Sequence, residues 1–133
     1  MGAGRPVHAC LAVVERGGKI LLVRRAKPPG IGKWGFPGGR LEPGETELQC
    51  AERELREELA IEADPVRVLT TFDYASFHLV AVLCRWRAGE GRLIEEASDF
   101  GWFALAEAET LDTFPDAVPA MRLAVAQNRG VGE

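Results

Sequence analysis

Residues 39–61 read GRLEPGETELQCAERELREELAI, a glycine-rich loop followed by a helical pattern. Thr46 is the predicted N-cap of this helix because Gln49, three residues later, completes a capping box. Apolar side chains then recur at helical spacing and predict one face buried in the core: Leu48, Ala51, Leu55 and Leu59. The rest of the chain is therefore interpreted around this helix.

The same helix carries an acidic face. Glu54 precedes Glu57 by three residues and Glu58 by four, so their carboxylates point into one region of space. Like charges at these spacings destabilise a helix by roughly 0.2–0.5 kcal/mol per pair, and the helix dipole disfavours anions near the C-terminus. The helix alone leaves two interpretations open. One is a solvated face, partly neutralised by Arg53 and Arg56, and the other is a divalent-cation site.

The spacing of these residues resembles the signature of the Nudix hydrolases, G-x5-E-x7-R-E-U-x-E-E-x-G-U, in which U is a bulky aliphatic residue. The matching residues stand in order and at the right spacing: Gly39, Glu45, Arg53, Glu54, Leu55, Glu57, Glu58 and Ile61. Ala60 departs from the signature because it stands where the family has a helix-ending glycine. A left-handed residue there costs side chains other than glycine about 1 kcal/mol or more. The resemblance favours the cation site over the solvated face.

The resemblance implies a catalytic set built on hard oxygen ligands. Glu57 and Glu58 would bind Mg²⁺, or Mn²⁺ in its place, and Glu54 would be a further ligand or the base that activates water. The backbone carbonyl of Gly39 would be another metal ligand. The reaction would then be attack of water on a phosphorus atom, with a phosphate-containing leaving group.

The other signature residues would support this set. Arg53 would act in catalysis by orienting the carboxylates, as a rigid guanidinium suits. Glu45 would be an ion-pair partner of Arg53 with a chiefly structural role, and Leu55 and Ile61 would be structural members of the motif.

Residues 95–99 (EEASD) form a second acidic cluster, just before a predicted strand over Gly101–Leu105. They either form an acidic surface loop or supply one more carboxylate to the site. The resemblance implies the second, with a loop carboxylate as metal ligand or general base. Glu96 is the first choice, Glu95 the second, and Asp99 is weaker.

Three side chains are candidates for substrate binding. Arg24 and Arg25 end a predicted strand, and neighbouring strand residues face opposite ways, so at most one of them points into a given pocket. That arginine would contact a phosphate; the alternative is a pair of solvated charges. Trp34 either packs in the core or stacks on a base.

The order of elements predicts an α+β, or mixed α/β, fold. A Gly17-Gly18 turn joins two antiparallel strands, and a second hairpin follows the helix after a predicted turn at Asp64-Pro65. The predicted elements around these turns are strands over 6–16, 19–25, 34–36, 66–74 and 77–87, a helical turn over 106–111 and a helix over 117–128. The resemblance implies the Nudix fold, a curved mixed sheet between helices, as one domain over residues 1–133.

Composition narrows the function classes. A net charge of −4 argues against binding to a nucleic-acid polymer, and no apolar run approaches the ~20 residues of a membrane span. The N-terminus lacks the apolar core of a signal peptide. Cys10, Cys50 and Cys84 match no metal spacing or disulfide framework. We therefore expect reduced thiols and a cytoplasmic location.

The expected substrate is a small nucleotide. Residues 21–39 resemble the corresponding segment of ADP-ribose pyrophosphatases, which favours a nucleoside diphosphate linked to another group. The C-terminal part resembles MutT-type nucleoside triphosphate pyrophosphohydrolases, a close second, but Val118 stands where that group has a base-reading asparagine. A nucleotide-sensing module without catalysis is the alternative of another class. All signature glutamates are present, which favours an enzyme, and the family allows a homodimer.

Overall fold

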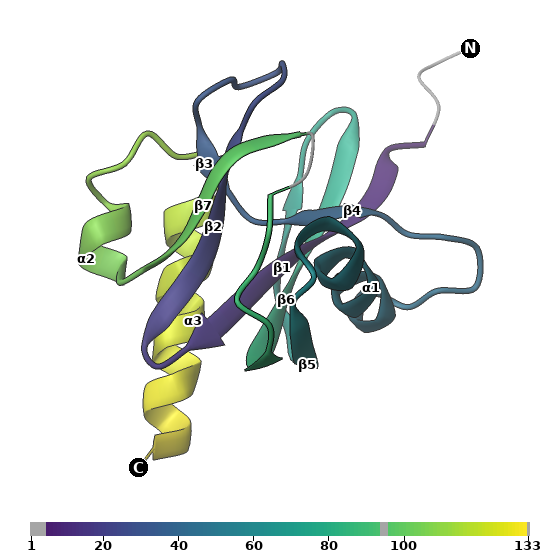
Figure 1. Cartoon of the computed structure of the whole chain (residues 1–133). Helices are drawn as coiled ribbons and strands as arrows, with labels where there is room; N and C mark the ends of the chain where they lie inside the picture. The colour runs from purple at the N-terminus through teal and green to yellow at the C-terminus, as the bar shows by residue number, and fades with distance from the viewer. Residues whose placement is uncertain (1–4, 94–95, 133) are drawn as a thin grey trace.

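The computed structural model describes residues 5–93 and 96–132 (Figure 1). The elements in chain order are β1 (Val7–Arg16), β2 (Lys19–Arg25), β3 (Trp34–Gly35), β4 (Gly38–Arg40), α1 (Glu47–Leu59), β5 (Glu62–Asp73), β6 (Phe77–Ala88), β7 (Ala97–Phe103), α2 (Leu105–Ala108) and α3 (Ala117–Gly132). None of the described helices is long and apolar enough to cross a membrane.

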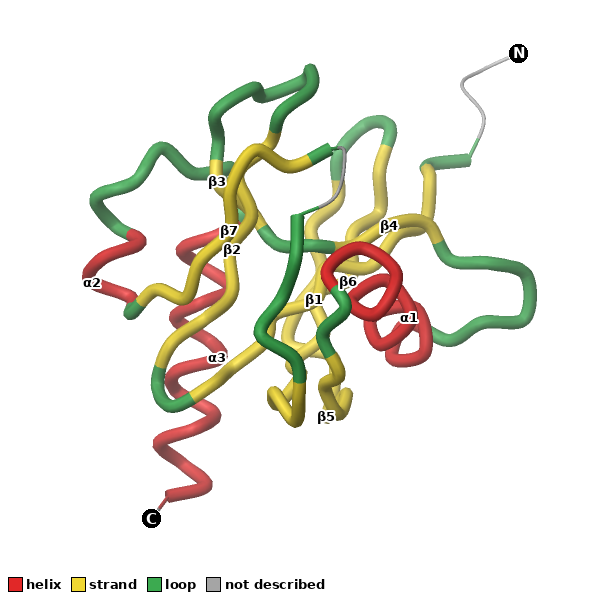
Figure 2. The backbone as a smooth tube through the Cα atoms, in the orientation of Figure 1, coloured by secondary structure: helices red, strands yellow, loops and turns green. Residues whose placement is uncertain are grey.

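The sheet is mixed and is built around β1. Along one edge, β1 pairs in parallel with β6, which in turn pairs antiparallel with β5. Along the other edge it pairs antiparallel with β4 at Ala9–Leu11 and with β2 at Glu15–Arg16. β2 also pairs with β3 and β7 (Figure 2). β2 and β4 therefore pair with different ends of β1.

The strand β1 separates two hydrophobic cores. On one face Cys10, Ala12 and Val14 pack with the apolar side of α1, and on the other face Val13 packs with α3. A strand buried on both faces has a nearly continuous apolar sequence, which accounts for the composition of β1. The predicted α+β class, with a mixed sheet between helices, is confirmed.

The helix α1 begins as the sequence predicts. The Thr46 hydroxyl accepts a hydrogen bond from the Gln49 backbone N–H at 3.1 Å, and the Gln49 side chain accepts one from the Thr46 N–H at 2.9 Å. The helix ends at Leu59, and Ala60 follows in the left-handed conformation with φ 55°. Ala60 therefore adopts the backbone geometry that the family meets with glycine.

Replacement of Ala60 by glycine should stabilise the protein. Glycine adopts a left-handed conformation without the steric cost that a Cβ imposes, so we expect the free energy of unfolding to rise by about 1 kcal/mol. Urea unfolding of Ala60→Gly against the parent chain measures the change. A lower stability would mean that the Ala60 methyl group makes contacts worth more than the backbone strain.

Three predicted boundaries were wrong. Asp64-Pro65 is not a turn, because β5 continues through it. The pairing register of β5 against β6 shifts after Pro65, and β5 is the outer strand of this sheet. Proline is tolerated at such bulges and edges because it has no N–H to contribute to the ladder. Gly38–Arg40 is a strand rather than a loop. β7 begins at Ala97, so most of the predicted acidic loop is strand.

Candidate active site

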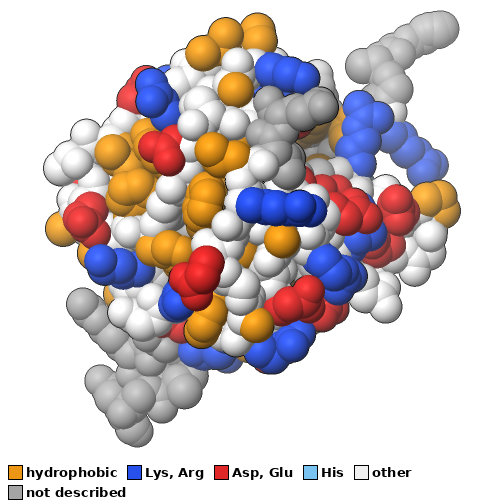
Figure 3. Space-filling view, in the orientation of Figure 1, with side chains coloured by type: hydrophobic (Ala, Val, Ile, Leu, Met, Phe, Trp, Pro, Cys, Tyr) orange, Lys and Arg blue, Asp and Glu red, His pale blue; other side chains and the backbone are white. Residues whose placement is uncertain are grey.

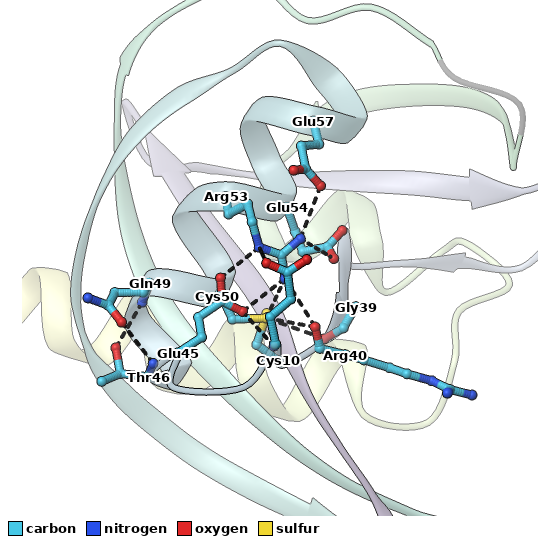
Figure 4. Close-up of polar contacts among 11 residues, drawn as sticks. Cys10, Gly39, Arg40, Glu45, Thr46, Gln49, Cys50, Arg53, Glu54 and Glu57 are labelled. Carbon is cyan, nitrogen blue, oxygen red and sulfur yellow. Dashed lines mark hydrogen bonds and ion pairs between the residues drawn. The ribbon is translucent and has the colours of Figure 1, made fainter.

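The guanidinium of Arg53 is the centre of the polar network on α1 (Figure 4). It donates two bonds to Glu45, from Nε at 2.6 Å and from Nη2 at 2.9 Å. Nη1 donates to Glu54 at 3.1 Å and to Glu57 at 3.0 Å, and Nη2 also donates to the Arg40 carbonyl at 3.1 Å. Arg53 therefore holds the loop before α1, the strand β4 and two carboxylates of the helix in one arrangement.

The Arg53–Glu45 pair is well shielded from solvent. The exposed fractions of the two side chains are 16% and 11%. The bonds from Arg53 lower the pKa of Glu45 to about 2, and the bonds to Glu45 raise the pKa of Arg53. Both groups therefore stay charged across the physiological pH range. The predicted ion pair is present in the structure; its role in catalysis stays a prediction.

Glu58 is partly buried and is crowded by other acidic groups. Burial raises the pKa of Glu58 to about 9, and its contact with the Glu54 carboxyl group adds to this effect. The charge of Glu96 acts in the same direction, whereas a hydrogen bond from the Gly38 backbone opposes it. Carboxylates crowded in this way repel one another, and a bound cation would relieve that repulsion.

The backbone of β4 lies directly under these carboxylates. A Cβ on Gly39 would come within 2.3 Å of Glu54 Oε2, and a Cβ on Gly38 within 2.1 Å of the Cys10 carbonyl oxygen. Gly38 therefore requires glycine because of its pairing with β1, whereas a side chain at Gly39 would displace the Glu54 carboxylate. Figure 3 shows acidic and basic side chains gathered side by side over α1.

The direction of the Gly39 carbonyl differs from the prediction. Its oxygen faces the buried Cys50 thiol, with Sγ at 3.4 Å, and so points toward the core (Figure 4). The backbone of Gly38 bonds the Glu58 carboxyl group, and the N–H and C=O of one strand residue point to the same side. Gly38 is therefore better placed than Gly39 to offer a carbonyl ligand to a cation.

The donor set fits a hard divalent cation. Glu54 and Glu58 share a contact beside Gly38, and carboxylate and carbonyl oxygens are the ligands that Mg²⁺ takes together with water and substrate phosphate. Within residues 5–93 and 96–132, no three His, Cys, Asp or Glu side chains converge into a finished metal site. Substrate phosphates and water would therefore have to complete the coordination.

A cavity of about 380 Å³ lies beside the acidic face. Glu58 and Glu96 line it on the α1 side, together with Gly38 of β4. Its other walls carry Arg25 and an apolar group of side chains that includes Phe77, Leu79 and Phe114. The cavity therefore joins a charged region to an apolar one, as a nucleotide site requires.

The structure brings together some of the predicted substrate-site and loop residues. Arg25 lines the cavity, whereas Arg24 and Trp34 do not. Trp34 packs against the second core, with its ring 5.1 Å from that of Phe103 in an edge-to-face arrangement. Glu96 lines the cavity as its predicted role requires, and Glu95 lies outside the described residues.

Asp116 is a cavity residue that sequence reasoning missed. Its exposed fraction is 9%, the Tyr74 hydroxyl donates to it at 3.4 Å, and burial raises its pKa. Phe114, two residues earlier, lies against Gly30 and Gly35, where a Cβ would come within 2.6 and 2.8 Å of its ring. The only signal in the sequence was the position of both residues in the segment before the last helix.

The fold and the site together define a class of protein. It is a small α+β protein in which a glycine-rich strand and the acidic face of a helix lie beside a cavity of about 380 Å³. The chain belongs to the Nudix family, since the family model described as NUDIX domain matches residues 4–124. The prediction made from the signature is therefore confirmed.

Relatives of known name agree with this assignment. The CTP pyrophosphohydrolase of Escherichia coli K12 is 44% identical over 73 residues, an alignment that covers 54% of this chain and half of the length of that protein. A MutT NUDIX hydrolase structure from Burkholderia pseudomallei matches with a TM-score of 0.77 and 30% identity, over 90% of this chain and 98% of that one. An ADP-ribose pyrophosphatase structure from Streptococcus suis has a TM-score of 0.77 over 94% and 93% of the chains, but at 23% identity it shows the fold alone.

Replacement of Gly39 by alanine should weaken cation binding. The new methyl group would meet Glu54 Oε2 at 2.3 Å and push the carboxylate away from β4. We expect Mn²⁺ affinity, measured by titration calorimetry, to fall about tenfold or more, as it does when groups that hold metal ligands are disturbed. Gly18→Ala is a control for the general cost of replacing a glycine: its positive φ of 84° strains alanine, but a Cβ there meets nothing within 4 Å. Equal Mn²⁺ affinity in Gly39→Ala and the parent would contradict the placement of Glu54 in the cation site.

Proposed function

We propose that this chain is a divalent-cation-dependent pyrophosphohydrolase that cleaves a phosphoanhydride bond of a small nucleotide. The observation that carries the proposal is the position of Glu58, which lines the cavity, is bonded by the Gly38 backbone and is crowded by the Glu54 carboxyl group. A polyanionic substrate would be repelled by these carboxylates alone, so the site requires a cation between them and the phosphates.

Each residue has a role in this proposal. Glu54, Glu57 and Glu58 would hold the cation, which when bound neutralises phosphate charge and makes bound water more acidic. Arg53 fixes Glu54 and Glu57 through its Nη1 bonds. Glu96 lines the same cavity as Glu58 and would hold a ligand position or accept the proton of the attacking water. No protein nucleophile is needed, because water itself forms the new P–O bond.

The cavity supports a nucleoside triphosphate as the substrate, ahead of a nucleoside diphosphate linked to another group. A base would lie against Phe77 and Phe114, with its polar edge toward Asp116, and its phosphates would extend toward Glu58. The apolar recess that the described residues form beside the acidic face suits a base followed by a phosphate chain. The name of the 44% identical relative points the same way. We therefore rank a triphosphate ahead of an ADP-ribose-like substrate, whereas the resemblance of segment 21–39 favoured the ADP-ribose-like one.

A substrate panel tests the proposal directly. Purified protein is incubated with Mg²⁺, or with a chelator, and with CTP, other normal and oxidised (d)NTPs, ADP-ribose, NADH, dinucleoside polyphosphates and sugar nucleotides. We expect metal-dependent release of pyrophosphate from a triphosphate as the preferred reaction. Preference for ADP-ribose would show that a nucleoside diphosphate linked to another group is the substrate instead. Tight nucleotide binding without turnover of any compound in the panel would identify a sensing module.

Asp116 should contribute to recognition more than to chemistry. Replacement of Asp116 by alanine removes a buried hydrogen-bonding group from the cavity wall, so we expect KM for the preferred nucleotide to rise about tenfold with little change in kcat. The neighbouring exposed carboxylate in Asp112→Ala is the matched control. A fall in kcat at unchanged KM would place Asp116 outside the base subsite.

A further inference from the structure

Two buried cysteine thiols, those of Cys10 and Cys50, lie in contact with each other behind the glycine-rich strand β4. Cys10 and Cys50 are both fully buried, and their Sγ atoms are 2.8 Å apart although 40 positions separate them in the sequence. Cys10 lies on β1 directly opposite Gly39 of β4, and Cys50 lies in the first turns of α1. The pair therefore stands where β1, β4 and α1 meet.

The Cys50 thiol reaches the backbone of β4. Its Sγ lies 3.4 Å from the Gly39 carbonyl oxygen and 3.6 Å from that of Arg40 (Figure 4). The Arg40 carbonyl already accepts a bond from Arg53 at 3.1 Å. A thiol has one hydrogen to donate, and Cys10 donates its own to Cys50. The hydrogen of Cys50 is therefore available for Gly39.

We propose that Cys50 is a positioning residue for the cation site, acting through a relay in which Cys10 donates to Cys50 and Cys50 donates to the Gly39 carbonyl. The relay adds a side-chain support to β4, beside its backbone pairing with β1, beneath the acidic face. Glu54 rests on Gly39, where a Cβ would come within 2.3 Å of its carboxylate, and Glu58 bonds the Gly38 backbone. Two of the proposed metal-binding carboxylates thus rest on the segment that the thiols support.

The chemical state of Cys50 suits this role. Its hydrogen bond from Cys10 and its burial raise the pKa of the thiol, so it remains a neutral donor rather than a thiolate nucleophile. Arg53 Nη2 also lies 3.8 Å from Cys50 Sγ, which joins the relay to the Arg53 network. Because the cation belongs to the proposed function, this inference rests on it, and its test needs a readout besides turnover.

The test compares alanine and serine at Cys50 with alanine at Cys84. Cys84 is a third fully buried cysteine, but among the residues that the structure describes its Sγ bonds only the Val82 carbonyl of its own strand, at 3.7 Å. We expect Cys50→Ala to weaken Mn²⁺ binding, followed by electron paramagnetic resonance, about tenfold or more. Cys50→Ser keeps a donor and should recover most of the affinity, and Cys84→Ala should bind Mn²⁺ as the parent does. Thermal unfolding of all variants without metal separates this effect from a loss of stability.

A double-mutant cycle tests the relay itself. Cys10→Ala should weaken Mn²⁺ binding in the parent background and have no further effect in Cys50→Ala, because the first thiol acts only through the second. Additive losses, or equal losses in Cys50→Ala and Cys84→Ala, would overturn the proposal and leave the thiols as packing groups. If the variants show the expected Mn²⁺ affinities but the parent chain cleaves nothing in the substrate panel, the proposed function is contradicted and the relay is still supported.

Discussion

Glu58→Gln is expected to reduce kcat by about 10³-fold while the fold is preserved. Glutamine keeps the size of the side chain but removes the negative charge that we assign to the cation, and losses of this order follow removal of one electrostatic contact to a transition state. The measurement is the rate of product release from the preferred nucleotide at saturating Mg²⁺. Glu52→Gln on the same helix is the control, because Glu52 neither lines the cavity nor bonds Arg53 among the described residues. Parent-like turnover of Glu58→Gln would remove this carboxylate from the mechanism.

The same variant should be more stable than the parent in the absence of metal. The pKa of Glu58 is raised in the folded state from 4.5 to about 9, so the carboxyl group ionises more readily in the unfolded chain. Stability is therefore lost as the pH rises from about 4.5 to about 9, and glutamine does not titrate. We expect the difference in Tm between Glu58→Gln and the parent to grow between pH 5 and pH 9 with a chelator present. A constant difference would contradict the crowded environment of Glu58.

Arg53→Met should have the largest effect on stability. The change leaves Glu45 and Glu54, with exposed fractions of 11% and 14%, as charges without their cationic partner. Removal of one member of a buried pair costs about 3 kcal/mol or more, and we expect activity to fall with it because Glu54 and Glu57 lose their orientation. Urea unfolding measures the loss, and Arg56→Met, an exposed position on the same helix, is the control.

The pH dependence of that loss identifies its source. The pKa of Glu45 falls on folding from 4.5 to about 2, so its contribution to stability is present above pH 4.5 and is lost as the pH falls toward 2. The difference between the parent and Arg53→Met should therefore be large at pH 7 and smaller at pH 3. The double variant Glu45→Leu and Arg53→Met should recover much of the stability without recovering activity. A penalty that persists unchanged at pH 3 would indicate lost packing of the arginine stem instead.

The acidic helix could be predicted from sequence because its determinants are local. The capping box of Thr46 and Gln49 and the spacing of Glu54, Glu57 and Glu58 all lie within one helix, where sequence distance determines spatial distance. Glu45 and Arg53 are eight positions apart, and the bond between them was predicted from the family signature.

Other features depend on contacts between distant segments. The direction of the Gly39 carbonyl depends on Cys50 and on pairing with β1, and the burial of Asp116 depends in part on Tyr74, 42 positions earlier. The break predicted at Asp64-Pro65 failed because the position of β5 at the outer edge of this sheet tolerates proline. Local propensity does not contain this information, since each outcome is decided by a segment that is distant in the sequence.

The division of the core by β1 has a consequence for how such a protein can change over generations. The groups assigned to bond cleavage stand mainly on α1 and β4, whereas Phe114 and Asp116 lie in the segment before α3, which packs on the other face of β1. Substitutions around Asp116 can therefore alter the preferred base while the carboxylates and their backbone supports stay in place. Selection on this chain can act separately on what is cleaved and on how it is cleaved.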